Sequence, residues 1–133
     1  IRWHVRAYCE KKGEYLDFVM SRFRGTPELL NASEHGRKQD REWNTQVTAV
    51  VVPNPELSTT QQAIIASDYA MVEGKLLITQ RIPLLHYALE RLQVSYDGEH
   101  RDLSLQHPLV LANRTELIGQ GCRFKLKRTD MLS

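Results

Sequence analysis

The stretch Gln46-Val-Thr-Ala-Val-Val-Val52, followed by Pro53-Asn54-Pro55, decides the fold of this chain. A run so rich in β-branched side chains is typical of a strand that is well buried in a sheet. Proline has no N–H to donate to a neighbouring strand, so the two prolines predict the end of the strand. A buried strand is therefore expected over residues 46–52.

A helix is predicted directly after this strand. Ser58 stands three residues before Gln61, which is the spacing of a capping box, in which each side chain bonds the backbone N–H of the other residue. A helix of about 13 residues is expected from there, ended by Gly74. Its apolar stripe is expected to comprise Ala63, Ile64, Ala66 and Met71.

A second strand and a second helix follow, over residues 75–82 and 83–92. Pro83 suits the first turn of a helix, where its missing N–H costs nothing. The buried stripe of this helix is expected to comprise Leu84, Leu85, Ala88, Leu89 and Leu92. Further strand signal appears at 108–112 and 122–127, with one helical turn at 114–118. The order β-α-β-α followed by strand signal favours a ferredoxin-like α+β unit.

Upstream, residues 2–9 alternate strictly between the two faces of a predicted strand. Trp3, Val5, Ala7 and Cys9 lie on one face, and Arg2, His4, Arg6 and Tyr8 lie on the other. A turn signal over residues 10–14 and an aromatic, β-branched run over 15–23 complete an antiparallel hairpin. Residues 24–42 lose periodicity and are interpreted as a linker.

The polar face of this hairpin is the most informative feature of the sequence. Opposite residues in a hairpin lie within about 5 Å, so its cations would converge with Ser21, Arg22 and Arg24, and an anion or nucleotide pocket would relieve their repulsion. The alternative is a solvated face whose arginines pair with carboxylates, and spacing alone favours it. The candidate carboxylates are Glu10, Glu14 and Asp17.

The composition excludes several classes of protein. Hydrophobic residues make up 41% and charged residues 26% of the 133 residues, which is ordinary for a folded globular chain and excludes disorder. A net charge of +2 is too small to indicate nucleic-acid binding by itself. No apolar run approaches the roughly 20 residues that span a bilayer. Cys9 and Cys122 lack metal-ligand spacing, so reduced thiols in the cytoplasm are expected, with a disulfide as the alternative.

Catalysis and metal binding have little support in the sequence. The histidines are scattered singly, without cysteine or carboxylate neighbours at ligand spacing. No nucleophile, base and acid combine into a motif with a mechanism, and no glycine-rich phosphate loop is present. No enzyme activity, metal or cofactor is therefore expected.

Taken together, these residues resemble the WYL-domain transcription regulators, in particular the winged-helix repressors found beside phage-defence operons. Residues 2–9 look like the strand that holds the family's namesake motif, here Trp3-His4-Val5, and residues 17–23 resemble the strand that follows it. Residues 40–44, 53–55, 57–58, 68–71, 81 and 107–111 look like the characteristic positions of the C-terminal extension of these regulators. Ala70 departs from that pattern, because the subgroup often has glycine there.

The resemblance covers about residues 1–118 and implies two domains. Residues 1–42 would be the last part of a WYL ligand-sensing domain with its linker, contributing a partial Sm/SH3-like β-barrel hairpin. Residues 43–133 would be a C-terminal extension that dimerises. The earlier barrel strands and the winged-helix domain would lie outside this chain.

The function that the resemblance implies is a sensor without enzyme activity. The chain would form a homodimer, bind a nucleotide or short single-stranded nucleic acid as effector, and reach operator DNA only through the absent N-terminal domain, with no role at a membrane. Ligand binding would shift the population of DNA-binding states. The expected ligand-binding residues are His4, Arg6, Tyr8, Ser21 and Arg22.

Two functions of other classes remain open. A purely structural dimerisation module would leave the cations of the hairpin facing water. A hydrolase acting on nucleotides has only the basic face in its favour, since Glu14 and Asp17 are the only carboxylates near it.

Overall fold

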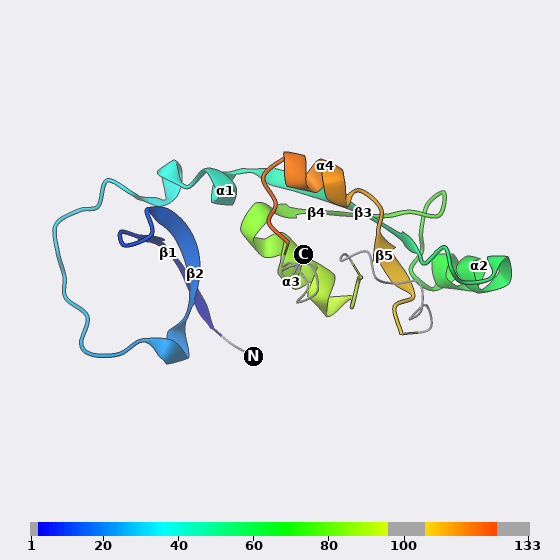
Figure 1. Cartoon of the computed structure of the whole chain (residues 1–133), viewed down its shortest axis with the longest axis horizontal. Helices are drawn as coiled ribbons and strands as arrows, with labels where there is room; N and C mark the ends of the chain where they lie inside the picture. The colour runs from blue at the N-terminus through cyan, green and yellow to red at the C-terminus, as the bar shows by residue number, and fades with distance from the viewer. Residues whose placement is uncertain (1–2, 96–105, 125–133) are drawn as a thin grey trace, which may run out of the picture. The chain divides into compact units, whose positions relative to one another are not determined.

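The computed structural model of the chain describes residues 3–95 and 106–124. The chain divides into two compact units, Ile1–Asn44 and Thr45–Ser133, which we call the first unit and the second unit. Each unit contains one small antiparallel sheet, accompanied by helices (Figure 1). The predicted α+β class is therefore confirmed.

The first unit is built on the predicted hairpin. Strands β1 (His4–Cys9) and β2 (Glu14–Val19) pair antiparallel, with His4 opposite Val19 and Cys9 opposite Glu14. Gly13, at φ 66°, donates its N–H to the carbonyl of Cys9 at 2.7 Å and closes the turn. The second strand is shorter than predicted, because the chain turns into a 3-10 helix, η1 (Met20–Arg22). Arg2 lies outside the described residues.

The predicted linker contains two short helical turns, η2 (Arg37–Gln39) and α1 (Arg41–Asn44). The Asn44 side chain holds them together, because its amide donates to the carbonyls of Arg37 and Asp40 at 2.8 and 2.9 Å. These bonds supply donors for backbone carbonyls that so short a helix cannot satisfy by itself.

The second unit contains a sheet of order β4-β3-β5, with β3 (Gln46–Pro53) paired antiparallel to both β4 (Leu76–Arg81) and β5 (Leu109–Leu111). The predicted strand at 46–52 is thus the central one. Alternate residues of β3 are buried on one face, which the pleat of a strand requires when one face meets a core. They are Val47, Ala49, Val51 and Pro53.

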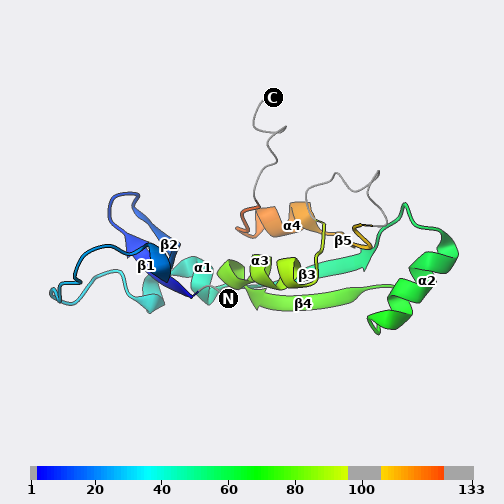
Figure 2. The same cartoon turned by 90° about the horizontal axis from the view of Figure 1, so that it is seen from below.

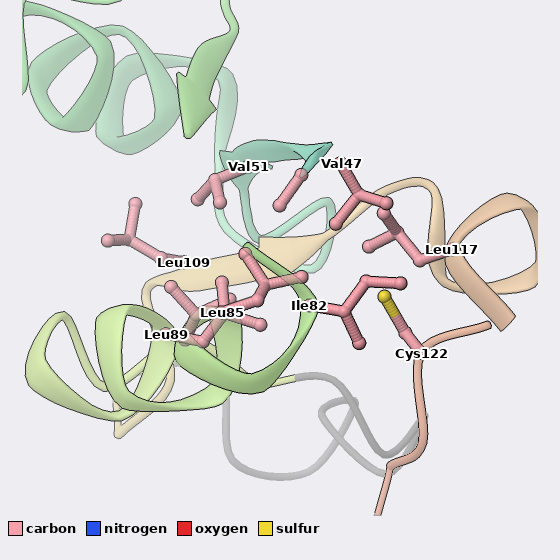
Figure 3. Close-up of a cluster of buried hydrophobic side chains, with 10 residues drawn as sticks. Val47, Val51, Ile82, Leu85, Leu89, Leu109, Leu117 and Cys122 are labelled. Atoms are coloured by element: carbon pink, nitrogen blue, oxygen red, sulfur yellow. The ribbon is translucent and has the colours of Figure 1, made fainter. Parts of the chain in front are cut away.

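Helices α3 (Ile82–Arg91) and α4 (Arg114–Gly119) lie on that buried face of the sheet, as Figure 2 shows. Their apolar side chains and those of β3 and β5 point toward one another (Figure 3). Leu85 and Leu89 are almost fully buried, which confirms their place in the predicted stripe. The core comprises Val47, Ala49, Val51, Ile82, Leu85, Leu89, Val94, Leu109, Leu117 and Cys122.

Helix α2 (Thr59–Asp68) begins at the predicted capping box, in which Ser58 and Gln61 bond each other's backbone N–H. It ends six residues before Gly74, because Ala70 adopts the left-handed region at φ 51°. The predicted stripe is wrong at Ala63 and Ile64, which are both exposed, Ile64 by 54%. The side chains that pack against the core from this segment are Ile65, Tyr69 and Met71.

Two asparagines complete the sheet where the strands end. The fully buried Asn54 donates its side-chain amide to the carbonyl of His107 at 3.0 Å and accepts the N–H of Glu56 at 2.9 Å. The Asn113 side chain accepts the N–H of Val50 at 2.8 Å and donates to the carbonyl of Thr48 at 2.9 Å. Asn113 thereby satisfies backbone groups of β3 beyond the short strand β5.

The predicted strand at 122–127 is not formed over residues 122–124, and the remainder lies outside the described residues. Among the described residues, no helix has the length and apolar character needed to cross a membrane. Cys9 and Cys122, both described, are not joined in a disulfide.

Candidate functional site

The polar face of the hairpin holds three of the five predicted ligand-binding residues. The register places His4 opposite Val19, Arg6 opposite Asp17, and Tyr8 opposite Tyr15. Since alternate residues of a strand point to the same side of the sheet, His4, Arg6 and Tyr8 share one face. We call it the hairpin face.

Arg6 occupies the centre of the hairpin face and is surrounded by carboxylates. Its guanidinium donates two hydrogen bonds to Asp40, from Nε to Oδ2 at 2.6 Å and from Nη2 to Oδ1 at 3.0 Å. Asp17 Oδ1 and Glu42 Oε2 each lie 3.6 Å from its terminal nitrogens. This cluster makes Arg6 a fixed anchor between the hairpin and the segment that carries Asp40.

Asp40 is buried, and its charge is stabilised locally. Burial by itself would raise the pKa of Asp40, but the hydrogen bonds from Arg6 and from the Trp43 N–H, together with the positive charge of Arg6, lower it below its ordinary value. Burial likewise opposes the charge of Arg6, and the bond to Asp40 outweighs it, so the pKa of Arg6 is raised. Both groups are therefore ionised near neutral pH.

One end of the hairpin face is aromatic. The Tyr8 ring stacks on the His35 imidazole, with centroids 3.7 Å apart and planes 13° apart, and meets Tyr15 edge-on at 5.2 Å. The Tyr15 hydroxyl donates to the carbonyl of Gly36 at 3.1 Å. Burial and the nearby charge of Asp40 raise the pKa of this hydroxyl. Stacked rings beside charged groups are suited to a planar, polar ligand.

A cavity of about 240 Å³ opens at this aromatic end. That volume lies slightly below the range of roughly 300 to 1,000 Å³ typical of small-molecule pockets, so it fits one ring-sized group of a ligand. Its polar and aromatic lining comes from Arg6, Tyr8, Tyr15, His35, Arg37, Asp40 and Trp43.

The other two predicted residues, Ser21 and Arg22, lie near the opposite end of the hairpin. They belong to η1, which is joined to the start of β1 by a bond from the Met20 N–H to the carbonyl of Trp3 at 2.9 Å. Tyr8 lies four residue steps along the strand from His4, about 13 Å at 3.3 Å per residue. The structure therefore brings Ser21 and Arg22 to the His4 end and not to the cavity. That all five residues bind a ligand stays a prediction.

No pattern in the sequence pointed to the residues that close the cavity opposite the hairpin. His35, Arg37, Asp40 and Trp43 lie in the segment interpreted as a linker, without periodicity. Only the family resemblance singled out residues 40–44. Within the described ranges, no three histidine, cysteine, aspartate or glutamate residues are grouped as metal ligands.

Comparison with known proteins concerns mainly the second unit. A family model described as "BrxR transcriptional regulator, C-terminal dimerization domain" matches residues 46–117. The chain belongs to this family. The match begins at the first residue of β3 and ends within α4, so the dimerization-domain family accounts for the sheet, its helices and its core.

Curated relatives extend the similarity to most of the chain. "DNA-binding transcriptional repressor CapW" of Escherichia coli (strain KTE188) is 35% identical over 122 residues, and its namesake in Pseudomonas aeruginosa is 34% identical over 117 residues. The Stenotrophomonas maltophilia protein of the same description is 30% identical over 117 residues. These alignments cover 87 to 88% of this chain but only 38 to 39% of each relative.

Proposed function

We propose that this chain is the regulatory, self-associating part of a DNA-binding transcriptional repressor, without catalytic activity. The observation that carries the proposal is the match of a dimerization-domain family to residues 46–117. Relatives described as DNA-binding transcriptional repressors are more than twice as long as the part aligned here. DNA binding is therefore assigned to a part of the protein outside these 133 residues. The repressor acts in the cytoplasm. The resemblance to repressors beside phage-defence operons suggests such operons as its targets.

Within this proposal the second unit joins two copies of the chain, and the first unit is the end of a WYL-type domain that senses an effector. The effector is a nucleotide or a short single-stranded nucleic acid. Tyr8, at the cavity, stacks on a base with the ring face that His35 does not cover, while Arg22 and His4 contact phosphate about 13 Å away along the strand. Arg6, held by carboxylates, fixes the cavity wall in place.

Binding of labelled oligonucleotides tests the sensor. Fluorescence anisotropy of short single-stranded DNA and RNA is measured against the 133-residue chain at two salt concentrations. Because a stacked base contributes about 1–3 kcal/mol, Tyr8→Ala is expected to weaken binding roughly 5- to 150-fold. Because each phosphate contact releases counterions, Arg22→Ala is expected to reduce the slope of log affinity against log salt by about 0.7.

Lys12→Ala is the matched control, since it removes one exposed cation from the turn of the same hairpin. It is expected to leave affinity and salt slope almost unchanged. Equal losses in all three variants would indicate attraction by net charge alone and would count against the site.

The second candidate is a structural dimerisation module with no ligand of its own. The cluster around Arg6 favours it, because three carboxylates compensate the charge at the centre of the hairpin face. Absence of saturable binding by any oligonucleotide, with a dimer still present, would establish this alternative for the chain.

A further inference from the structure

The sheet of the second unit has one face that helices α3 and α4 do not cover. Helices α3 and α4 pack on the opposite face (Figure 2). On the uncovered side, Val50 lies opposite Leu77 and Thr48 lies opposite Thr79, with the two threonine hydroxyls 2.9 Å apart. We call this side, carrying Thr48, Val50, Val52, Leu77 and Thr79, the outer face. Leu77 at its centre is 62% exposed.

The outer face continues into an apolar groove at the α2 end of the unit. Val52 follows Val50 on the same face, lies opposite Val110 in β5, and lines a groove of about 640 Å³. Helix α2 supplies Ala63 and Ala66 to the groove. An apolar strip therefore runs from Leu77 across β3 to α2.

The chemistry of the strip is that of a buried surface. Its five outer-face residues carry no charge. Strand β4 has no proline, and its one charged residue, Arg81, stands at its end, opposite Gln46. Soluble proteins normally protect an edge strand with such residues and rarely expose a contiguous apolar patch without a partner. Ile64 of α2 and Val72, before β4, are also more than half exposed.

We infer that the outer face, centred on Leu77 and extending into the α2 groove, is the surface on which a second copy of this chain docks. The inference rests on the self-association proposed above. The matched family is described as a dimerization domain, so the partner on this face is a second copy of the chain. Two copies related by a two-fold axis must present the same patch to each other, and an uncharged apolar centre suits such a contact. The helix-covered face is unsuited, because its apolar side chains already form the core.

Sedimentation velocity of the 133-residue chain over a range of concentrations tests this surface. Leu77→Glu places a charge at the centre of the contact and is expected to raise the dimer dissociation constant at least 100-fold. Ile118→Glu is the matched control, since Ile118 is 45% exposed on α4 in the opposite layer, and it is expected to leave the constant unchanged. Far-UV circular dichroism establishes that both variants fold.

A cysteine variant provides a second measurement that does not depend on disrupting the contact. In a Cys9→Ser background, Leu77→Cys lies near the two-fold axis and is expected to form disulfide-linked dimers under mild oxidation, whereas Ile118→Cys is not. A dimer that survives Leu77→Glu and dissociates with Ile118→Glu would overturn the assignment of the face. A wild-type chain that stays monomeric at high micromolar concentration would instead overturn the proposed self-association itself.

Discussion

At the scale of single residues, Asp40 organises the first unit. Its carboxylate accepts two bonds from Arg6 in β1 and one from the Trp43 N–H. Removing one partner of a buried ion pair is costly because the other charge stays desolvated. The hairpin and residues 37–44 therefore depend on one ionised group.

The free energy of unfolding of the first unit should depend on pH because of Asp40. The pKa of Asp40 is lower in the folded chain than its ordinary 3.8, so its contribution is complete above about pH 5 and is lost as the pH falls through the folded pKa. Asp40→Asn is expected to cost on the order of 3 kcal/mol at neutral pH and to remove that acid dependence. Both tryptophans, Trp3 and Trp43, lie in the first unit, so tryptophan fluorescence during acid and urea titration reports the change.

Asp17→Asn serves as the comparison for Asp40→Asn. Asp17 is 3.6 Å from Arg6 and more exposed, and such pairs contribute at most about 1 kcal/mol. An equally large loss in this variant would contradict the central role of Asp40.

For these residues, the sequence predicted the shared face of the strand but not the main partner of Arg6. The strict alternation of residues 2–9 predicted that His4, Arg6 and Tyr8 share a face, because strand geometry is local. It also left open that arginines pair with carboxylates, and Arg6 does contact Asp17. The main partner, Asp40, is 34 residues away in a segment without periodicity, and no local pattern encodes a contact at that separation.

At the scale of elements, α2 shows how a backbone conformation can override an apolar pattern. The capping box fixed the start of the helix, whereas Ala70 at φ 51° ends it early. An alanine in the left-handed region carries a conformational free-energy cost of about 1–2 kcal/mol. Glycine avoids that cost, and the repressor subgroup that this sequence resembles often has glycine at this position. The predicted stripe had included Ile64 because sequence spacing alone does not show which face a short helix turns to the core.

Ala70→Gly is therefore expected to stabilise the second unit by about 0.5–1 kcal/mol, after allowing for the greater freedom of glycine in the unfolded chain. Ala63→Gly, the same substitution inside α2, should destabilise it by about 1 kcal/mol. Urea denaturation followed by far-UV circular dichroism measures both. Changes of the same sign would show that strain at Ala70 does not limit the helix.

At the scale of the whole molecule, the chain consists of two compact units that are stabilised in different ways. The second unit has a continuous apolar core, and patterns of β-branched strands and leucine-rich helices predicted most of it. The first unit is held by one hairpin and one ion cluster. A pocket on the hairpin face was predicted, and Arg6 and Tyr8 of that prediction line the cavity. The other wall, from residues 35–43, was not predicted, since it comes from a segment far from the hairpin strands in the sequence.

Thermal unfolding at several protein concentrations should distinguish the two units. If the second unit dimerises, each tenfold rise in protein concentration stabilises it by about 1.4 kcal/mol, so its calorimetric transition is expected to move to higher temperature. The tryptophan signal of the first unit should move little. Leu77→Glu should abolish the concentration dependence, and its persistence in that variant would contradict the assigned surface.

The long connection between η1 and η2 has a practical consequence. The Arg6–Asp40 pair fixes its far end to the hairpin, while Leu29 is fully exposed and Leu30 is 79% exposed near its middle. Each doubling of loop length adds only about 0.6 kcal/mol of closure entropy. A small fluorescent domain inserted between Leu29 and Leu30 would therefore leave the hairpin and its ion cluster intact, and would provide a reporter of effector binding inside the living cell.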